Sequence, residues 1–249
     1  FIAILSAVGS GLNFYFLGSL VPVFLFLLID IFFLKKFICK SFDKKKILID
    51  VARSFIIFYF LLVLFWIDTH PNIFVLPFSF FWEWFIGDFW RGIPVLLNGN
   101  YFVYEDIPKS YLIVNLIYKS PEYFLLTYII FMATFVNSNK FYKKKFFLFN
   151  YKLLLVTSMI IFPFLLVFFT PFSIYDGLRH VLWMLPYFCI IPGLAIYYLI
   201  ENIDFLIAKM TLSFLSLLII YFLFNFFLIT PYQYTYLNIF NGKIENRYK

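Results

Sequence analysis

The chain has 249 residues, of which 64% are hydrophobic and 13% charged, and its formal net charge is +7. Soluble domains are about half apolar and about a quarter charged, so this composition excludes a soluble globular protein and indicates an integral membrane protein. The positive charge does not indicate nucleic-acid binding, because the lysines fall in loops between apolar runs, where the positive-inside rule explains them.

Cysteine and histidine are too few for the common metal sites. Cys39 and Cys189 form neither a disulfide framework nor a zinc-binding spacing, and His70 and His180 are the only histidines. The sequence has no Gly-rich phosphate loop and no nucleophile elbow. We therefore expect no metal and no cofactor. The sequence opens inside an apolar stretch without an initiator methionine, so we expect a fragment of a longer protein.

Apolar runs near the roughly 20 residues that cross a bilayer recur along the chain. Residues 1–12 indicate the end of one helix, and the 123–136 run is expected to begin before Pro121. These runs predict an all-α fold, a polytopic transmembrane helix bundle in a single membrane domain over 1–249. The expected spans, about six in number, are residues 16–34, 47–66, 123–136, 150–170, 181–200 and 212–229.

Lysine-rich segments orient these spans. Residues 35–46 and 140–145 are expected to be two basic loops, which the positive-inside rule assigns to the cytoplasm. The segment 68–119, the turn 170–180 and the tail from Thr230 then share the external face. The aromatic residues of 68–119 predict interfacial helices that lie flat at headgroup depth in this external loop.

The turn Ser173-Ile174-Tyr175-Asp176-Gly177-Leu178-Arg179-His180 is the densest polar cluster at a predicted membrane boundary. Such charges are costly there unless they meet water, one another or a charged ligand, and a phosphate fits best. Arg179 would bind it bidentately, with Asp176 orienting Arg179 or His180. The alternative is a solvated loop in which Arg179 reaches the lipid headgroups.

Two further regions carry distinctive residues. Asn98-Gly99, Pro108 and Pro121 indicate turns within a structured external loop. After the last apolar run, Pro231-Tyr232-Gln233-Tyr234-Thr235-Tyr236-Leu237-Asn238 has three alternating tyrosines, which are typical of an interfacial aromatic belt.

Together these motifs resemble those of membrane-embedded glycosyltransferases of the protein mannosyltransferase type, which are glycosyltransferase family 39 enzymes with the GT-C fold and depend on a phospholipid carrier. The resemblance covers about 150 residues. It rests on Tyr175 to His180 with Pro186, on Gly99, Ile107-Pro108-Lys109-Ser110-Tyr111 and Lys119-Ser120-Pro121, and on Pro231-Tyr232-Gln233, Tyr236 and Asn238.

The resemblance implies transfer of a sugar from a polyprenyl-phosphate donor to an acceptor at the external face of a bacterial inner (plasma) membrane. The partners would be the polyprenyl-phosphate sugar, an unidentified acceptor and the lipid bilayer, without nucleic acid. The lipid-linked sugar is a substrate and not a cofactor. The implied phosphate- and substrate-binding residues are Arg179, His180, Asp176, Lys109 and Tyr111.

The resemblance places the catalytic acid of these enzymes in a first external loop, which we expect to lie upstream of Phe1. The catalytic base is therefore not assigned within this chain. Two other classes stay open: a secondary transporter or lipid flippase, and a non-catalytic membrane scaffold. Few charges lie within spans (Asp30 and Arg53, both near predicted cytoplasmic ends), which is unlike a transporter with polar groups at the bilayer midplane.

Overall fold

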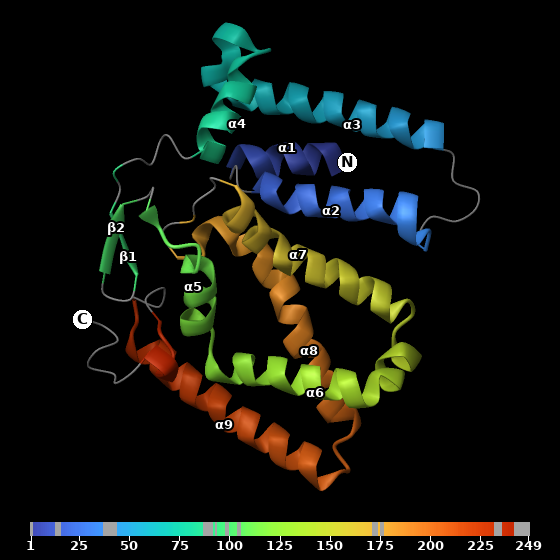
Figure 1. Ribbon diagram of the computed structural model, residues 1–249, viewed down its shortest axis with the longest axis vertical. Coiled ribbons are helices and arrows are strands. Elements are labelled where there is room, and N and C mark those ends of the chain that lie inside the picture. The colour runs from blue at the N-terminus through green and yellow to red at the C-terminus, as the bar shows by residue number, and fades with distance from the viewer. Residues whose placement is uncertain are drawn as a thin grey trace. The chain divides into compact units, whose positions relative to one another are not determined.

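The computed structural model describes residues 2–12, 16–36, 44–86, 92, 94–97, 100–103, 106–170, 174, 177–231 and 236–241. Figure 1 shows that these residues are mostly helical. The chain divides into two compact units, each built from two stretches of sequence. The first unit comprises Phe1–Lys109 and Thr157–Met184, and the second comprises Ser110–Val156 and Leu185–Lys249. The expectation of a single membrane domain stays a prediction.

The first unit begins with helices that follow the apolar runs. The small residues Ala3, Ser6, Ala7 and Ser10 are buried on one face of α1 (Ile2–Leu12), which packs against α3 (Lys44–Phe65). Small side chains let helix backbones approach closely, which is a common way to pack helices in membranes. The helices of the first unit before the hairpin are α1 (Ile2–Leu12), α2 (Leu17–Ile29), the π-helical turn η2 (Asp30–Leu34), α3 (Lys44–Phe65), the 3₁₀ helix η3 (Ile67–Asn72) and α4 (Leu76–Ile86).

A short hairpin follows α4 and was not predicted. Strands β1 (Pro94–Leu97) and β2 (Asn100–Val103) pair antiparallel, with Pro94 opposite Val103 and Leu97 opposite Asn100. Val95 and Leu97 are buried whereas their neighbours on β1 are exposed, as the two-residue period of a strand requires. Asn98 and Gly99, where a turn was predicted, lie outside the described residues.

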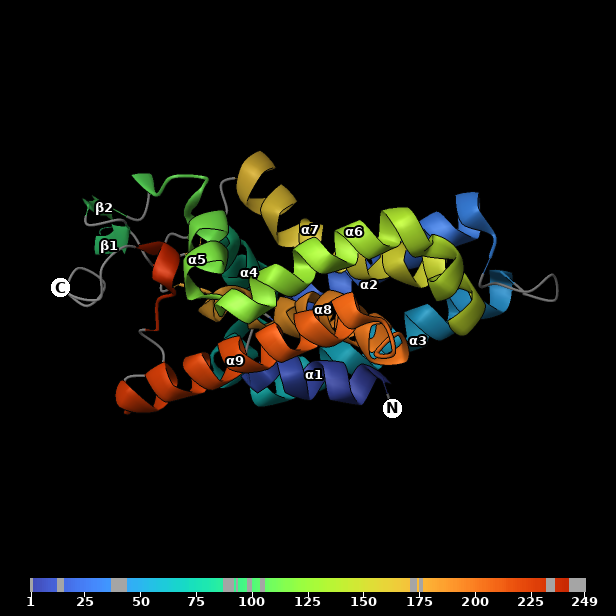
Figure 2. The ribbon, with the colours of Figure 1, turned by 90° about the horizontal axis from the view of Figure 1, so that it is seen from below.

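In the second unit, α6 (Glu122–Lys145), α8 (Leu185–Glu201) and α9 (Leu206–Leu228) pack around a core that includes Leu199, Ala208 and Leu215. Its helices are α5 (Tyr111–Lys119), α6 (Glu122–Lys145), α8 (Leu185–Glu201), α9 (Leu206–Leu228) and the 3₁₀ turn η8 (Ile239–Asn241). The helix α7 (Phe149–Phe169) begins in this unit and continues into the first. The chain returns to the second unit between η6 (Arg179–Met184) and α8. Figure 2 shows α8 and α9 from a second side.

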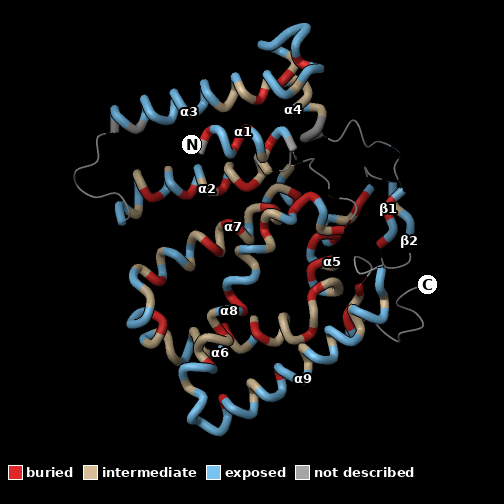
Figure 3. Tube along the Cα trace, turned by 180° about the vertical axis from the view of Figure 1, so that it is seen from behind, coloured by how far each residue is buried: buried red, intermediate tan, exposed pale blue. Residues whose placement is uncertain are grey.

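Four helical segments are long and apolar enough to cross a membrane: Leu48–Phe65, Phe149–Phe169, Arg179–Glu201 and Leu206–Leu228. The predicted spans at 47–66, 150–170, 181–200 and 212–229 correspond to them. Leu62 is the only buried residue of Leu48–Phe65, and Ala208 and Leu215 are the only buried residues of Leu206–Leu228. Figure 3 colours most of α3 and α9 as exposed or intermediate. Apolar surface of this extent belongs in a lipid environment.

The two other predicted spans are not among these four segments. Gly18–Leu34 is apolar but shorter, and α6 has a polar second half beginning at Asn137. The all-α fold is therefore confirmed, apart from the hairpin, and four of the described helical segments are long and apolar enough to cross a membrane. The six predicted spans stay a prediction.

Two predicted boundaries near α6 are wrong. The helix was expected to run through Pro121, but Ser120 is extended (ψ 136°) and separates α5 from α6. The proline ring disfavours helical backbone in the residue before it, which accounts for this break. The basic residues 140–145, expected to be a loop, are the last turns of α6. Lysine has good helix propensity, so a charged run continues a helix beyond its apolar part.

Candidate functional site

The predicted site residues divide between the two units. Lys109, Arg179 and His180 belong to the first unit, and Tyr111 belongs to the second. Asp176 lies outside the described residues, so its predicted role as the orienter of Arg179 or His180 stays a prediction.

Arg179 and His180 open the 3₁₀ helix η6, yet their environments differ. Arg179 is exposed, whereas His180 is buried, with 4% of its surface accessible. Gly177, just before them, is buried with a φ of +67°, a left-handed conformation that costs an L side chain energy. This backbone turn thus directs the Arg179 side chain outward and the adjacent His180 side chain into the protein interior.

Lys109 lies beside the C-terminal end of α7. Its Nζ donates a hydrogen bond of 3.1 Å to the carbonyl oxygen of Thr170, the residue after the helix. The last carbonyls of a helix have no partner within it, and the helix dipole makes a nearby cation favourable. Lys109 therefore caps the C-terminal end of α7, where the predicted phosphate-binding turn starts. The ammonium has three N–H donors, and this bond uses one of them.

Trp183 fixes η6 against α2 within the first unit. A Cβ added at Gly18 would lie 3.1 Å from Trp183 Nε1 and 3.4 Å from Cε2, so the indole lies directly on the glycine. The ring of Phe162 lies 6.5 Å from that of Trp183, centroid to centroid. No local pattern in the sequence marks Gly18 or Trp183, because only the fold brings them together.

We expect Gly18→Leu to displace Trp183 and to lower the free energy of unfolding by about 1–3 kcal/mol, the usual cost of overpacking. Thermal unfolding of the purified protein would measure this. Gly11→Leu is the matched control, since no atom lies within 4 Å of a Cβ added there. Equal loss of stability in both variants would contradict a role for the Gly18–Trp183 contact.

Tyr111, the predicted site residue in the second unit, is the first residue of α5. Its side chain is buried, with 4% of its surface accessible, and its carbonyl accepts a hydrogen bond of 2.9 Å from Asn115 Nδ2. A side chain this buried is part of the packing of α5. Its predicted contact with substrate stays a prediction.

The chain after α9 returns to the start of α6 and binds it through Asn238. This side chain is fully buried, and its Nδ2 donates to the carbonyl oxygens of Ile117 at 2.5 Å and Ser120 at 2.8 Å. The Asn238 backbone N–H donates to the carbonyl of Tyr118 at 2.8 Å. One asparagine thus satisfies carbonyls at the C-terminal end of α5, which have no partner within that helix.

Glu122 completes this contact from the other side of Pro121. Its buried carboxylate accepts one hydrogen bond from the Tyr236 hydroxyl at 3.0 Å and one from the Ile239 backbone N–H at 2.8 Å. The Tyr236 ring packs edge-on against Phe222 of α9, with centroids 5.1 Å apart. We name this set of contacts the tail junction. Its members are Ile117, Tyr118, Ser120, Glu122, Tyr236, Asn238 and Ile239.

The tail junction joins two motifs that are more than 100 residues apart in the sequence. Lys119-Ser120-Pro121 and the Tyr236–Asn238 segment were singled out separately, the second as part of an aromatic belt. Tyr236 instead points into the protein, where 6% of it is accessible. Glu122 was missed, because a single glutamate after a proline has no signal of its own in the sequence.

Asp30 is a buried carboxylate within the apolar part of the first unit. It lies in the π-helical turn η2, and its Oδ1 accepts a hydrogen bond of 3.1 Å from the backbone N–H of Lys36. The carboxylate thus caps the backbone where the helix ends. Within the described ranges, no group of three or more His, Cys, Asp or Glu residues could hold a metal ion.

Comparison with known proteins adds no relative to this description. No protein-family model, no curated protein and no solved structure matches the chain.

Proposed function

We propose that this chain is part of a membrane glycosyltransferase that transfers a sugar from a polyprenyl-phosphate donor to an acceptor at the external face of a bacterial inner membrane. The observation that carries the proposal is the tail junction. Two motifs of the glycosyltransferase resemblance, distant in sequence, meet through the buried side chains of Glu122 and Asn238. Motifs that form one structural feature support a common origin more strongly than motifs that merely follow one another.

In the proposed reaction, the acceptor hydroxyl attacks the anomeric carbon of the sugar. The bond between that carbon and the phosphate oxygen breaks, and the electron pair leaves with the polyprenyl phosphate. A carboxylate base takes the proton of the hydroxyl. Negative charge grows on the departing phosphate, and cations placed there in advance stabilise the transition state.

Arg179 is the proposed cation for this phosphate. It is exposed, it begins η6, and its backbone is fixed by the buried Gly177 and by the Trp183 contact with Gly18. A planar guanidinium offers paired N–H donors that match a phosphate. Lys109 is the second candidate, because its exposed ammonium lies at Thr170, where the turn starts. The burial of His180 favours a supporting role for that residue.

The proposal includes about six spans, with the 68–119 loop, the Arg179 turn and the tail on the external side. This orientation can be tested with single cysteines in a variant that lacks Cys39 and Cys189. We expect exposed Asp106→Cys to react with an impermeant thiol reagent added outside intact cells, and exposed Lys144→Cys to react only after permeabilisation. The reverse pattern would overturn the orientation.

The activity itself is tested with membranes that contain the full-length protein and a polyprenyl-phosphate sugar. We expect polyprenyl phosphate to be released in an amount equal to the sugar transferred, and only when an acceptor is present. Movement of the intact lipid-linked sugar across the bilayer, without cleavage, would support a flippase instead.

A further inference from the structure

Four exposed lysines surround the turn between α6 and α7 in the second unit. We name them the lysine face: Lys140, Lys143 and Lys144 on α6, and Lys152 on α7. Residues three and four positions apart lie on the same side of a helix, so Lys140, Lys143 and Lys144 form one stripe. The next residue, Lys145, has a different role.

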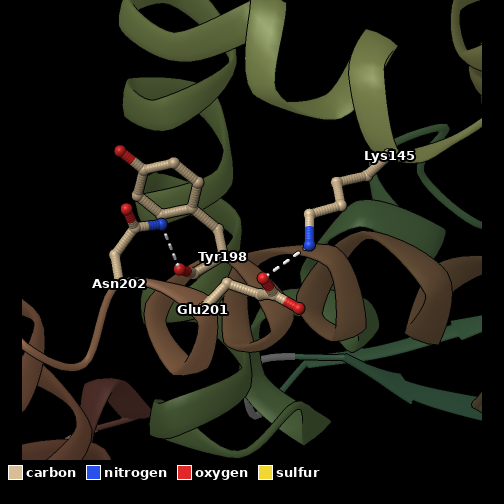
Figure 4. A network of polar contacts seen from close by, with 4 residues as sticks. All are labelled: Lys145, Tyr198, Glu201 and Asn202. Carbon is tan, nitrogen blue, oxygen red and sulfur yellow. Dashed lines mark hydrogen bonds and ion pairs between the residues drawn. The ribbon is translucent and has the colours of Figure 1, made fainter.

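Lys145 forms an ion pair with Glu201 at the end of α8, with 2.6 Å between Nζ and Oε2 (Figure 4). The hydrogen bond to Glu201 raises the pKa of the Lys145 ammonium, so Lys145 stays charged at neutral pH. The carboxylate of Glu201 is thus bound to Lys145 and to none of the four lysines of the lysine face. In the part of the chain that the structure describes, none of the four lysines of the lysine face forms an ion pair.

Aromatic packing holds the lysine face in place. The rings of Tyr142 and Phe149 stack across the α6–α7 turn, with centroids 5.1 Å apart. Phe141 and Phe146 pack against α8, at 5.0 Å from Tyr198 and 5.4 Å from Tyr197. The inner sides of α6 and α8 are therefore joined by rings, and the lysines are left on the outer surface.

The ends of three candidate spans locate this surface at a membrane boundary. One span begins at Phe149, one ends at Glu201 and one begins at Leu206. Three lysines of the lysine face precede Phe149, and Lys152 lies in the first turn of the candidate span that begins there, so we expect their ammonium groups at the level of the lipid headgroups. Lysine side chains extend towards headgroup phosphates at this depth.

We infer that the lysine face is a binding site for the headgroups of anionic phospholipids. Its concentrated positive charge complements a phosphodiester, and Lys145, already paired with Glu201, keeps α6 and α8 together beneath it. This inference does not depend on the proposed glycosyltransferase activity. In the predicted topology the lysine face is on the cytoplasmic side of the membrane, whereas Arg179 is on the external side.

Native mass spectrometry of the purified chain, titrated with short-chain phosphatidylglycerol or phosphatidylcholine, tests the site. We expect phosphatidylglycerol to bind more tightly. The variant K140Q/K143Q/K144Q/K152Q should lose at least about tenfold in that affinity, because each lysine near an anionic surface contributes roughly a fivefold effect. The matched control K140R/K143R/K144R/K152R keeps the four positive charges at the same positions and should lose less than about twofold.

Three outcomes would overturn the inference. The two lipids could bind equally well, the two variants could lose affinity equally, or inorganic phosphate could displace phosphatidylglycerol at a similar concentration. The last outcome would indicate a site for free phosphate. Thermal unfolding of both variants, in which Lys145 and Glu201 are retained, verifies that the fold is preserved.

Discussion

Arg179→Ala is expected to reduce sugar transfer by the full-length protein at least about 100-fold, the usual cost of removing one donor that stabilises transition-state charge. The physical reason is that the departing phosphate gains negative charge as the glycosidic bond breaks. Arg179→Lys should retain part of the activity, since it keeps the charge but loses the paired N–H donors. Release of polyprenyl phosphate by isolated membranes measures the effect.

Arg53→Ala is the control for this experiment. Arg53 is also exposed, and it forms only a 3.9 Å ion pair with Asp50 on the same helix, so its removal should leave transfer unchanged. The amount of Arg179→Ala protein in the membrane should equal that of the wild type, because an exposed arginine contributes little to folding. Wild-type activity of Arg179→Ala would exclude the phosphate-binding role.

Asn238→Leu is expected to lower the free energy of unfolding by about 2–4 kcal/mol, because it removes the donors of two carbonyls at the end of α5. Glu122→Leu should have an effect of the same order, since the Tyr236 hydroxyl and the Ile239 N–H lose their acceptor. Glu122→Gln keeps an acceptor oxygen and should cost less. Reversible unfolding in detergent, with proteolysis of the C-terminal tail as a second readout, measures these effects.

Asn225→Leu is the matched control for the tail junction. Asn225 is on α9, in a span that is mostly exposed, and its Nδ2 donates to the carbonyl of Tyr221 within the same helix at 2.8 Å. Replacement by leucine at this apolar surface should leave stability within about 0.5 kcal/mol of the wild type. If Asn238→Leu is no more destabilised than Asn225→Leu, the tail junction is not important for the fold.

The helices were largely predictable because their signal is local. Long apolar runs require helical structure in lipid, and α3, α7, α8 and α9 match their predicted runs. The errors occurred where local signals conflict. The lysines at 143–145 were assigned to a loop because of their charge, and Pro121 was placed within a helix because the residues after it are apolar.

The site was predictable only in part, because its contacts are not local. The exposed position of Arg179 follows from a polar turn beside an apolar run, but the burial of His180 one residue later depends on how η6 packs. Asn238 was singled out by a motif, whereas its partners Ile117 and Ser120 are known only from the fold. Glu122 joins them through a return of the chain that no local pattern indicates.

Binding of the donor's carrier tests the central claim most directly, because it needs no catalytic base. Polyprenyl phosphate and the uncharged polyprenol are each titrated against the purified chain and followed by native mass spectrometry. The proposed function predicts that the wild type prefers polyprenyl phosphate by at least about tenfold, as expected for a charge-assisted contact with a phosphate. It also predicts that Arg179→Ala removes this preference while Arg53→Ala retains it. Equal binding of both lipids by the wild type, or an unchanged preference in Arg179→Ala, would contradict it.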